Sequence, residues 1–169
     1  LFAVEFLKGK IDNLFIAGWF SYPTLHSFIQ SYFILIFGQT TQALRLMAAF
    51  AGALTVVLVF FVGRSMFGMV GGLCAAIFLA GMHYHIHFSR IGLINIWDGF
   101  FMILTLGFLW LGWKQNKRSA FLVAGLGLGL AQEFYATGRS IVLIILAWLL
   151  IAGLTDRSRL RRALPGLLL

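Results

Sequence analysis

The sequence predicts an all-α membrane protein, a polytopic bundle of transmembrane helices. Of its 169 residues, 61% are hydrophobic and only 11% are charged, whereas soluble proteins carry about 25% charged residues. From Ala43 onward, long apolar runs alternate with short segments that carry arginine or lysine. A helix needs about 20 apolar residues to cross the hydrocarbon core, and runs of nearly this length define the fold class.

Residues 1–42 are predicted to be an outer-loop segment that contains an interfacial helix. Residues 1–15 are mixed in polarity and too charged to cross a bilayer. Ser21 and Pro23 favour a helix start, and Gly38 favours its end. Apolar residues recur at helical spacing between them, but the stretch is shorter than a span. We therefore expect an amphipathic helix lying at the membrane surface.

Residues 43–169 are predicted to form the transmembrane helix bundle, with about five spans. The predicted spans are residues 43–62, 68–89, 96–113, 119–135 and 141–154. In the fourth span, Gly125 with Gly129 and Gly127 with Ala131 lie four residues apart, a spacing that favours close helix packing in lipid. The first residue is Leu1, and the final ALPGLLL resembles the opening of another apolar segment, so we expect a longer polypeptide.

Basic residues occur in alternate connections between the predicted spans. They are Arg64, then Lys114, Lys117 and Arg118, then Arg157, Arg159, Arg161 and Arg162. The positive-inside rule places these connections in the cytoplasm and leaves four of the five acidic residues on the opposite side. We therefore expect a multi-pass protein of the cell membrane with an extracytoplasmic active side. The net charge of +8 follows from topology and does not indicate nucleic-acid binding.

Residues 82–98, MHYHIHFSRIGLINIWD, place polar groups between two apolar runs. Gly92 and Asn95 weaken a continuous helix, so we expect a helix end, a short link and a new helix near Ile96. Arg90 would then lie at a span end, where a guanidinium suits a phosphate group. The alternative is that Arg90 only extends its charge to the membrane surface.

Three histidines in the same segment raise the question of a metal. The alternate spacing of His83, His85 and His87, with only Asp98 nearby, lacks a standard ligand signature. We therefore assign no metal ligand and no certain cofactor, and a divalent metal remains possible. Trp97 and Trp113, near span ends, are expected to be interface anchors.

A second polar cluster lies at the outer junction after the fourth span. It comprises Glu133, Tyr135 and Arg139. This cluster either takes part in a site or forms a structural ion pair. Cys74 lies inside an apolar run, so the sequence contains no disulfide framework.

An ordered set of motifs resembles one enzyme family. YPTLHSF and LIFG bound the interfacial helix, QALRLMAAFAGALTVVLVFFVGRSMFG and HIHFSRIGLINIWDGFF follow, and LVAGLGLGLAQEFYATGR comes last. Together they resemble bacterial and archaeal relatives of the dolichyl-phosphate-mannose protein mannosyltransferases, which are polytopic glycosyltransferases of the GT-C class. The resemblance implies transfer of a sugar from a polyprenyl-phosphate carrier to a glycan, lipid or protein acceptor at the outer face of the membrane.

The resemblance also suggests roles for individual residues. In such enzymes the first outer loop carries an acidic catalytic residue, so Glu5 and Asp12 are candidates, although the main base is expected upstream of Leu1. Many relatives carry an aspartate about five residues after the position of Arg90, where this chain has Asn95. The substrate-binding candidates are Arg90 and Arg139 for the donor phosphate, Lys10 as a third cation, and Asp98, Glu133 and His26.

A transporter or a structural membrane subunit is the rival interpretation. A transporter would place ionisable residues deep within its spans, whereas the stretches 46–62 and 100–113 contain none. A structural subunit would not need a polar cluster on its outer side. The sequence therefore favours a membrane glycosyltransferase.

Overall fold

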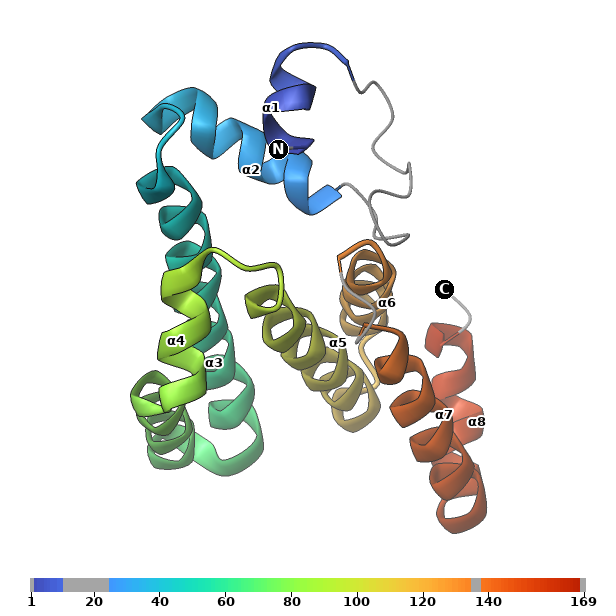
Figure 1. The fold of residues 1–169 in the computed structure, drawn as a ribbon. Helices are drawn as coiled ribbons and strands as arrows, with labels where there is room; N and C mark the ends of the chain where they lie inside the picture. The colour runs from blue at the N-terminus through green and yellow to red at the C-terminus, as the bar shows by residue number, and fades with distance from the viewer. Residues whose placement is uncertain (1, 11–24, 135–137, 168–169) are drawn as a thin grey trace.

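The computed structural model describes residues 2–10, 25–134 and 138–167, and these residues form helices without any strand (Figure 1). The helices are α1 (Phe2–Leu7), α2 (Leu25–Phe37), α3 (Thr41–Gly81), α4 (His83–Ile91), α5 (Ile96–Gln115), α6 (Arg118–Gln132), α7 (Gly138–Thr155) and α8 (Arg157–Leu167). Three of them, α3, α5 and α7, are long and apolar enough to cross a membrane. The predicted all-α class is confirmed.

Helix α3 is a hairpin of two helical arms. At Gly68 the backbone leaves the helical conformation, with φ 82° and ψ −178°, and the chain turns back. Gly72 in the second arm packs directly on the first, because a Cβ there would lie 2.6 Å from the backbone nitrogen of Arg64 and 2.7 Å from the carbonyl oxygen of Phe60. The first arm matches the first predicted span, whereas the second arm covers the second predicted span, residues 68–89, only as far as Gly81.

Helix α4 continues the second arm after a break at Met82, where φ is −70° and ψ is 125°. It runs back beside the first half of α3, since Gly92 lies against Leu44 and the His85 Nε2 donates to the carbonyl oxygen of Gly52 over 3.2 Å. Gly92 ends α4 in the left-handed conformation, with φ 71°. The predicted break and the new helix at Ile96 are therefore confirmed.

Helix α6 packs closely on α5 through Gly127. A Cβ at this position would lie 2.9 Å from the Oγ1 of Thr105, and Ala131 one turn later is also buried. The prediction was wrong for Gly125 and Gly129, which face open space. With 15 residues, α6 is shorter than the predicted fourth span.

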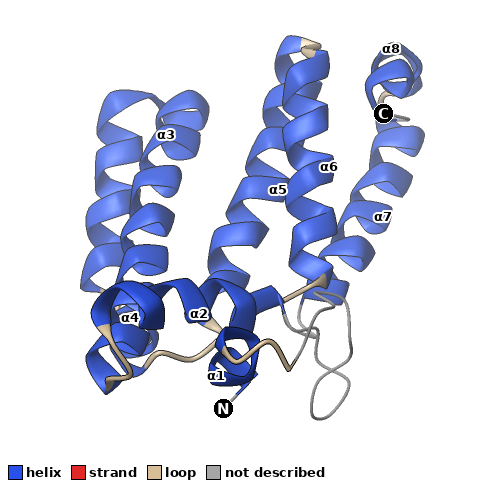
Figure 2. Ribbon diagram, turned by 90° about the horizontal axis from the view of Figure 1, so that it is seen from above, coloured by secondary structure: helices blue, strands red, loops and turns tan. Residues whose placement is uncertain are grey.

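The bundle has two different ends (Figures 1 and 2). The bend of α3 and the α5–α6 and α7–α8 turns lie at one end, and α1 and α2 lie at the other. Arg64, Lys114 and Arg157 belong to the first end, as the alternation of basic connections predicted. Lys114 lies 4.7 Å above the ring of Trp110, a cation–π contact at that end.

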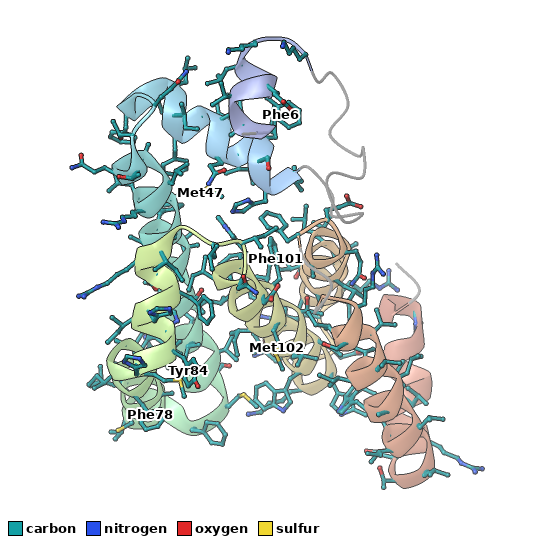
Figure 3. All side chains as sticks on the ribbon, in the orientation of Figure 1. Phe6, Met47, Phe78, Tyr84, Phe101 and Met102 are labelled. Atoms are coloured by element: carbon teal, nitrogen blue, oxygen red, sulfur yellow. The ribbon has the colours of Figure 1, made fainter. Side chains whose placement is uncertain are left out.

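Helix α2 covers the opposite end of the bundle (Figure 1). Gly38 ends it with φ 80°, as predicted, whereas its predicted start at Ser21 and Pro23 lies outside the described residues. Figure 3 shows Met47 of α3 and Phe101 of α5 in the core below α2. Phe6 joins α1 to this layer through an edge-to-face contact with Phe28, with ring centroids 5.5 Å apart.

Candidate functional site

The predicted site residues that the structure describes all lie toward the end of the bundle that carries α1 and α2. Asp12 lies outside the described residues. Glu5 is in α1 and Lys10 follows that helix, and His26 is in the first turn of α2. Arg90 is in the last turn of α4, and Asp98 is in the first turn of α5. Glu133 follows α6, and Arg139 is in the first turn of α7. They form two groups, one around Phe134 and one around Arg90.

Phe134 joins three helices at the first group. Its side chain is 1% exposed, and its ring centroid lies 5.2 Å from that of Trp97 and 4.8 Å from that of Phe101, both in α5. From α2, the His26 ring meets Phe134 edge to face at 6.2 Å. Aromatic pairs at these separations add to the burial energy. The end of α6 and the starts of α2 and α5 are thus held together.

Trp97 is a core residue and not the predicted interface anchor. It is only 7% exposed, because α2 and α6 cover the start of α5. Its indole N–H has no hydrogen-bond partner among the described residues. The sequence placed Trp97 correctly at the end of a span. It could not show that other helices cover this residue.

Polar residues lie next to the packed aromatic residues of this group in the sequence. Asp98 comes directly after Trp97 and Glu133 directly before Phe134, and both acidic residues are half-buried. The Gln132 Nε2 donates to the carbonyl oxygen of Gly138 over 3.0 Å, which brings the start of α7 to the same place. The structure shows no ion pair between Glu133 and Arg139, so the simpler structural interpretation of this cluster gains no support.

Burial changes the acid–base behaviour of His26. Desolvation at the contact between α2 and Phe134 lowers the pKa of the imidazole from 6.5 to about 4. The ring is therefore neutral near pH 7. It can exchange hydrogen bonds with a substrate but does not supply positive charge to a phosphate.

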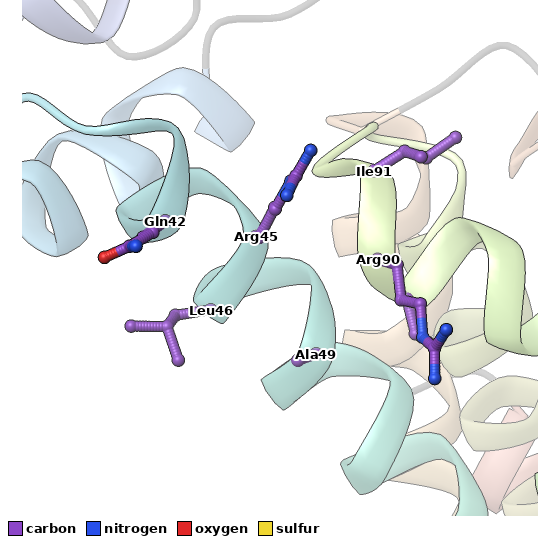
Figure 4. Close-up of a pocket in the computed structure, with 7 residues that line it drawn as sticks. Gln42, Arg45, Leu46, Ala49, Arg90 and Ile91 are labelled. Carbon is purple, nitrogen blue, oxygen red and sulfur yellow. The ribbon is translucent and has the colours of Figure 1, made fainter.

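Arg90 lies on the wall of an open pocket of about 620 Å³ between α3 and α4 (Figure 4). The pocket is lined by Gln42, Arg45, Leu46, Ala49, Ser89, Arg90 and Ile91. The guanidinium groups of Arg45 and Arg90 extend from opposite walls in different directions (Figure 4). Both side chains are exposed, and neither has an ion-pair partner among the described residues. The pocket thus combines positive charge with an apolar floor.

Arg45 was not predicted as a site residue. Arg45 lies in the second turn of α3, close to the positive end of the helix dipole. Cations are not favoured there, and this unfavourable position is the signal in the sequence that could have identified Arg45. Its closeness to Arg90 depends on the α3 hairpin and on the return of α4 beside the first arm. A sequence separation of 45 residues does not reveal that both residues line one pocket.

The histidines of α4 do not converge. His83 and His87 stack with ring centroids 6.2 Å apart, whereas His85 turns to Gly52. Within the described ranges, no three histidine, cysteine or acidic side chains are grouped so that they could hold a metal ion. The structure therefore assigns no metal ligands in the part of the chain that it describes.

The apolar helices define a helical membrane protein, and two arginines line the pocket between α3 and α4. The chain belongs to the dolichyl-phosphate-mannose-protein mannosyltransferase family, which it matches over residues 21–169. This confirms the resemblance and makes the protein a membrane glycosyltransferase in the general sense. Comparison with curated proteins and with solved structures gave no match.

Proposed function

We propose that the protein transfers a sugar from a polyprenyl-phosphate-linked donor to an acceptor hydroxyl of a glycan, lipid or protein at the outer face of the cell membrane. The observation that carries this proposal is the pocket between α3 and α4, where Arg45 and Arg90 flank the apolar side chains of Leu46 and Ala49. A lipid phosphate has the complementary chemistry, since it joins an anionic head to an apolar chain.

The reaction places specific demands on the site. The acceptor oxygen forms a bond to the anomeric carbon while the bond from that carbon to the phosphate oxygen breaks, and the electron pair leaves with the polyprenyl phosphate. Arginine stabilises the charge of this leaving group through charge-assisted hydrogen bonds. A carboxylate takes the proton of the acceptor hydroxyl. Both reactants must be held in line for this exchange.

The other predicted residues have proposed roles at the same end. Glu5, which is partly buried in α1, and Asp12 are the candidates in this chain for a carboxylate that acts as base. Arg139 and Lys10, both exposed, are further contacts for the donor phosphate. Asp98, Glu133 and His26 are proposed to bind substrate hydroxyls near Phe134.

The outer location rests on the distribution of charge between the two ends. The basic turns that contain Lys114, Lys117 and Arg118 and the start of α8 lie at the end opposite α1 and α2. Basic connections favour the cytoplasmic side. The pocket would then open toward the extracytoplasmic side, where a donor carried across the membrane becomes available.

Replacement of Arg90 tests the proposal. Arg90→Ala should lower kcat/KM for the lipid-phosphate donor about 10- to 100-fold, the effect of about 1.5–3 kcal/mol for a hydrogen bond to a charged group. Arg90→Lys should fall between Ala and wild type, because lysine keeps the charge and loses the two-pronged geometry. KM for the acceptor should change little. Radiolabelled donor turnover by the purified protein in phospholipid nanodiscs measures both.

Arg64→Lys, at the opposite end of the bundle, is the matched control and should behave as wild type. An Arg90→Lys protein with wild-type donor kinetics and normal expression would show that Arg90 only extends to the membrane surface. The phosphate role would then be wrong.

A further inference from the structure

We propose that a second pocket, between α1, α2 and the start of α3, binds a neutral glycosyl unit of the acceptor. The assignment of this ligand to the acceptor rests on the proposed transfer reaction. The pocket has a volume of about 240 Å³. It is lined by Ala3, Val4, Gln30, Ile34, Gln39, Thr40, Thr41 and Leu44. No charged side chain is among these residues.

The polar lining matches hydroxyl groups. Four of the eight lining residues carry an amide or a hydroxyl, and amides supply donors and acceptors together, as sugar hydroxyls require. The side chains of Gln30, Gln39 and Thr41 have no hydrogen-bond partner in the described part of the chain. The Thr40 Oγ1 accepts from the backbone N–H of Ala43 over 3.2 Å, so its own hydrogen remains available to donate.

The floor and size of the pocket narrow the ligand further. Ala3 and Ile34 are 2% and 7% exposed and give a firm apolar base, which suits the C–H face of a sugar ring. Ligand pockets usually enclose about 300–1,000 Å³. This pocket, with about 240 Å³, is smaller than that range, and its volume therefore suits a single sugar unit. Without a cation, the pocket offers nothing to select a phosphate.

The position of the pocket relates it to the arginines. Thr41 and Leu44 line the neutral pocket, whereas Gln42 and Arg45 line the pocket of Arg90. Successive helical residues are about 100° apart, so the first two turns of α3 form a wall with one pocket on each face. A neutral hydroxyl ligand and an anionic lipid phosphate would thus bind on two sides of the same helix turns.

Photolabelling with a hexoside tests the site directly. The intact protein in nanodiscs is irradiated with a diazirine-bearing methyl hexoside, and the labelled peptides are identified by mass spectrometry. We expect label on Ala3 or Val4 or within residues 30–44, and competition by the corresponding unmodified methyl hexoside. Gln30→Leu combined with Gln39→Leu should reduce labelling several-fold. Gln39→Leu alone, at an exposed position that leaves folding intact, should reduce it less.

Gln42→Leu is the matched control, because Gln42 has the same side chain and lies on the other face of α3. It should label as wild type does. Equal labelling of all variants, or label found only outside Ala3, Val4 and residues 30–44, would overturn the site.

Transfer of radiolabelled sugar from the donor to acceptors in a membrane extract, measured on the same preparation, tests the proposed function separately. Donor turnover without labelling would reject the glycosyl pocket alone. Labelling without donor turnover would reject the transfer reaction and leave a carbohydrate-binding site.

Discussion

His26 shows that packing can reverse what a residue type suggests. A histidine near a proposed phosphate site is an obvious cation, yet its contact with Phe134 keeps it neutral by lowering its pKa to about 4. Arg90 and Arg45 place guanidinium groups on the wall of the pocket between α3 and α4. Positive charge at this end of the molecule therefore comes from arginine and lysine, and His26 contributes a neutral polar surface.

The lowered pKa of His26 predicts a loss of stability in mild acid. The unfolded chain takes up a proton near pH 6.5 and the folded protein only near pH 4, so the free energy of unfolding should fall as the pH decreases through this window. The loss should be about 3 kcal/mol by pH 4 and should level off near pH 3, where the folded imidazole is also protonated. Thermal unfolding at a series of pH values measures it.

The His26→Phe variant is the control for this pH dependence, because it keeps an aromatic ring against Phe134 and cannot titrate. Its stability between pH 7 and pH 4 should be flatter than that of wild type by the same amount. Identical slopes for the two proteins would refute the assignment.

Individual site residues were predictable to different degrees. Arg90 stood out as a candidate because it is a cation at a span end beside Gly92, where a guanidinium suits either a phosphate or the membrane surface. Arg45 carries no comparable signal, and its role depends on a contact with α4 that only the fold provides. Trp97 misled because its position at a span end does not reveal that α2 and α6 bury it.

At the scale of elements, the α3 hairpin determines where α4 and its residues lie. The arms approach so closely that Gly63 also packs on the second arm, where a Cβ would lie 3.1 Å from the Cα of Gly72. Hydrophobicity predicted the two apolar arms, and Gly92 and Asn95 predicted the break after Arg90. The break at Met82, inside the predicted span 68–89, was not predicted. Hydrophobicity also did not separate the glycines of α6 into packed and open ones, since that depends on which face of the helix meets α5.

Substitution of Gly72 should therefore disrupt the hairpin. Gly72→Ala places a methyl group against the backbone of Arg64 and should destabilise the protein by about 1–3 kcal/mol. Gly81→Ala in the same arm is the matched control, because a Cβ there meets nothing within 4 Å. It should be neutral or slightly stabilising, since alanine favours the helix. Thermal unfolding in detergent compares them, and equal stability of the two variants would contradict the close approach.

At the scale of the whole molecule, the two ends of the bundle differ in charge and covering. The composition predicted the all-α membrane class. The positions of the basic residues along the chain predicted that the basic turns lie at the end opposite α1 and α2. Neither was sufficient to show that the candidate residues divide between the Phe134 junction and the Arg90 pocket. That division arises from tertiary contacts between segments far apart in sequence.

Sidedness gives a prediction for the whole molecule. In a Cys74→Ala background, a cysteine at Lys8 should react with a membrane-impermeant maleimide in intact cells. Cysteines at Lys117 and Arg157, which are exposed at the opposite end, should react only after permeabilisation. Strong labelling of all three in intact cells would exclude the proposed orientation.

The tight bend at Gly68 has a consequence for assembly order. The arms of α3 are neighbours along the chain, so their pairing closes a very short loop and costs little entropy. Contacts between segments close in sequence form fastest. During synthesis the hairpin can therefore pair before α5 emerges, and each later helix then adds to a template already present in the bilayer.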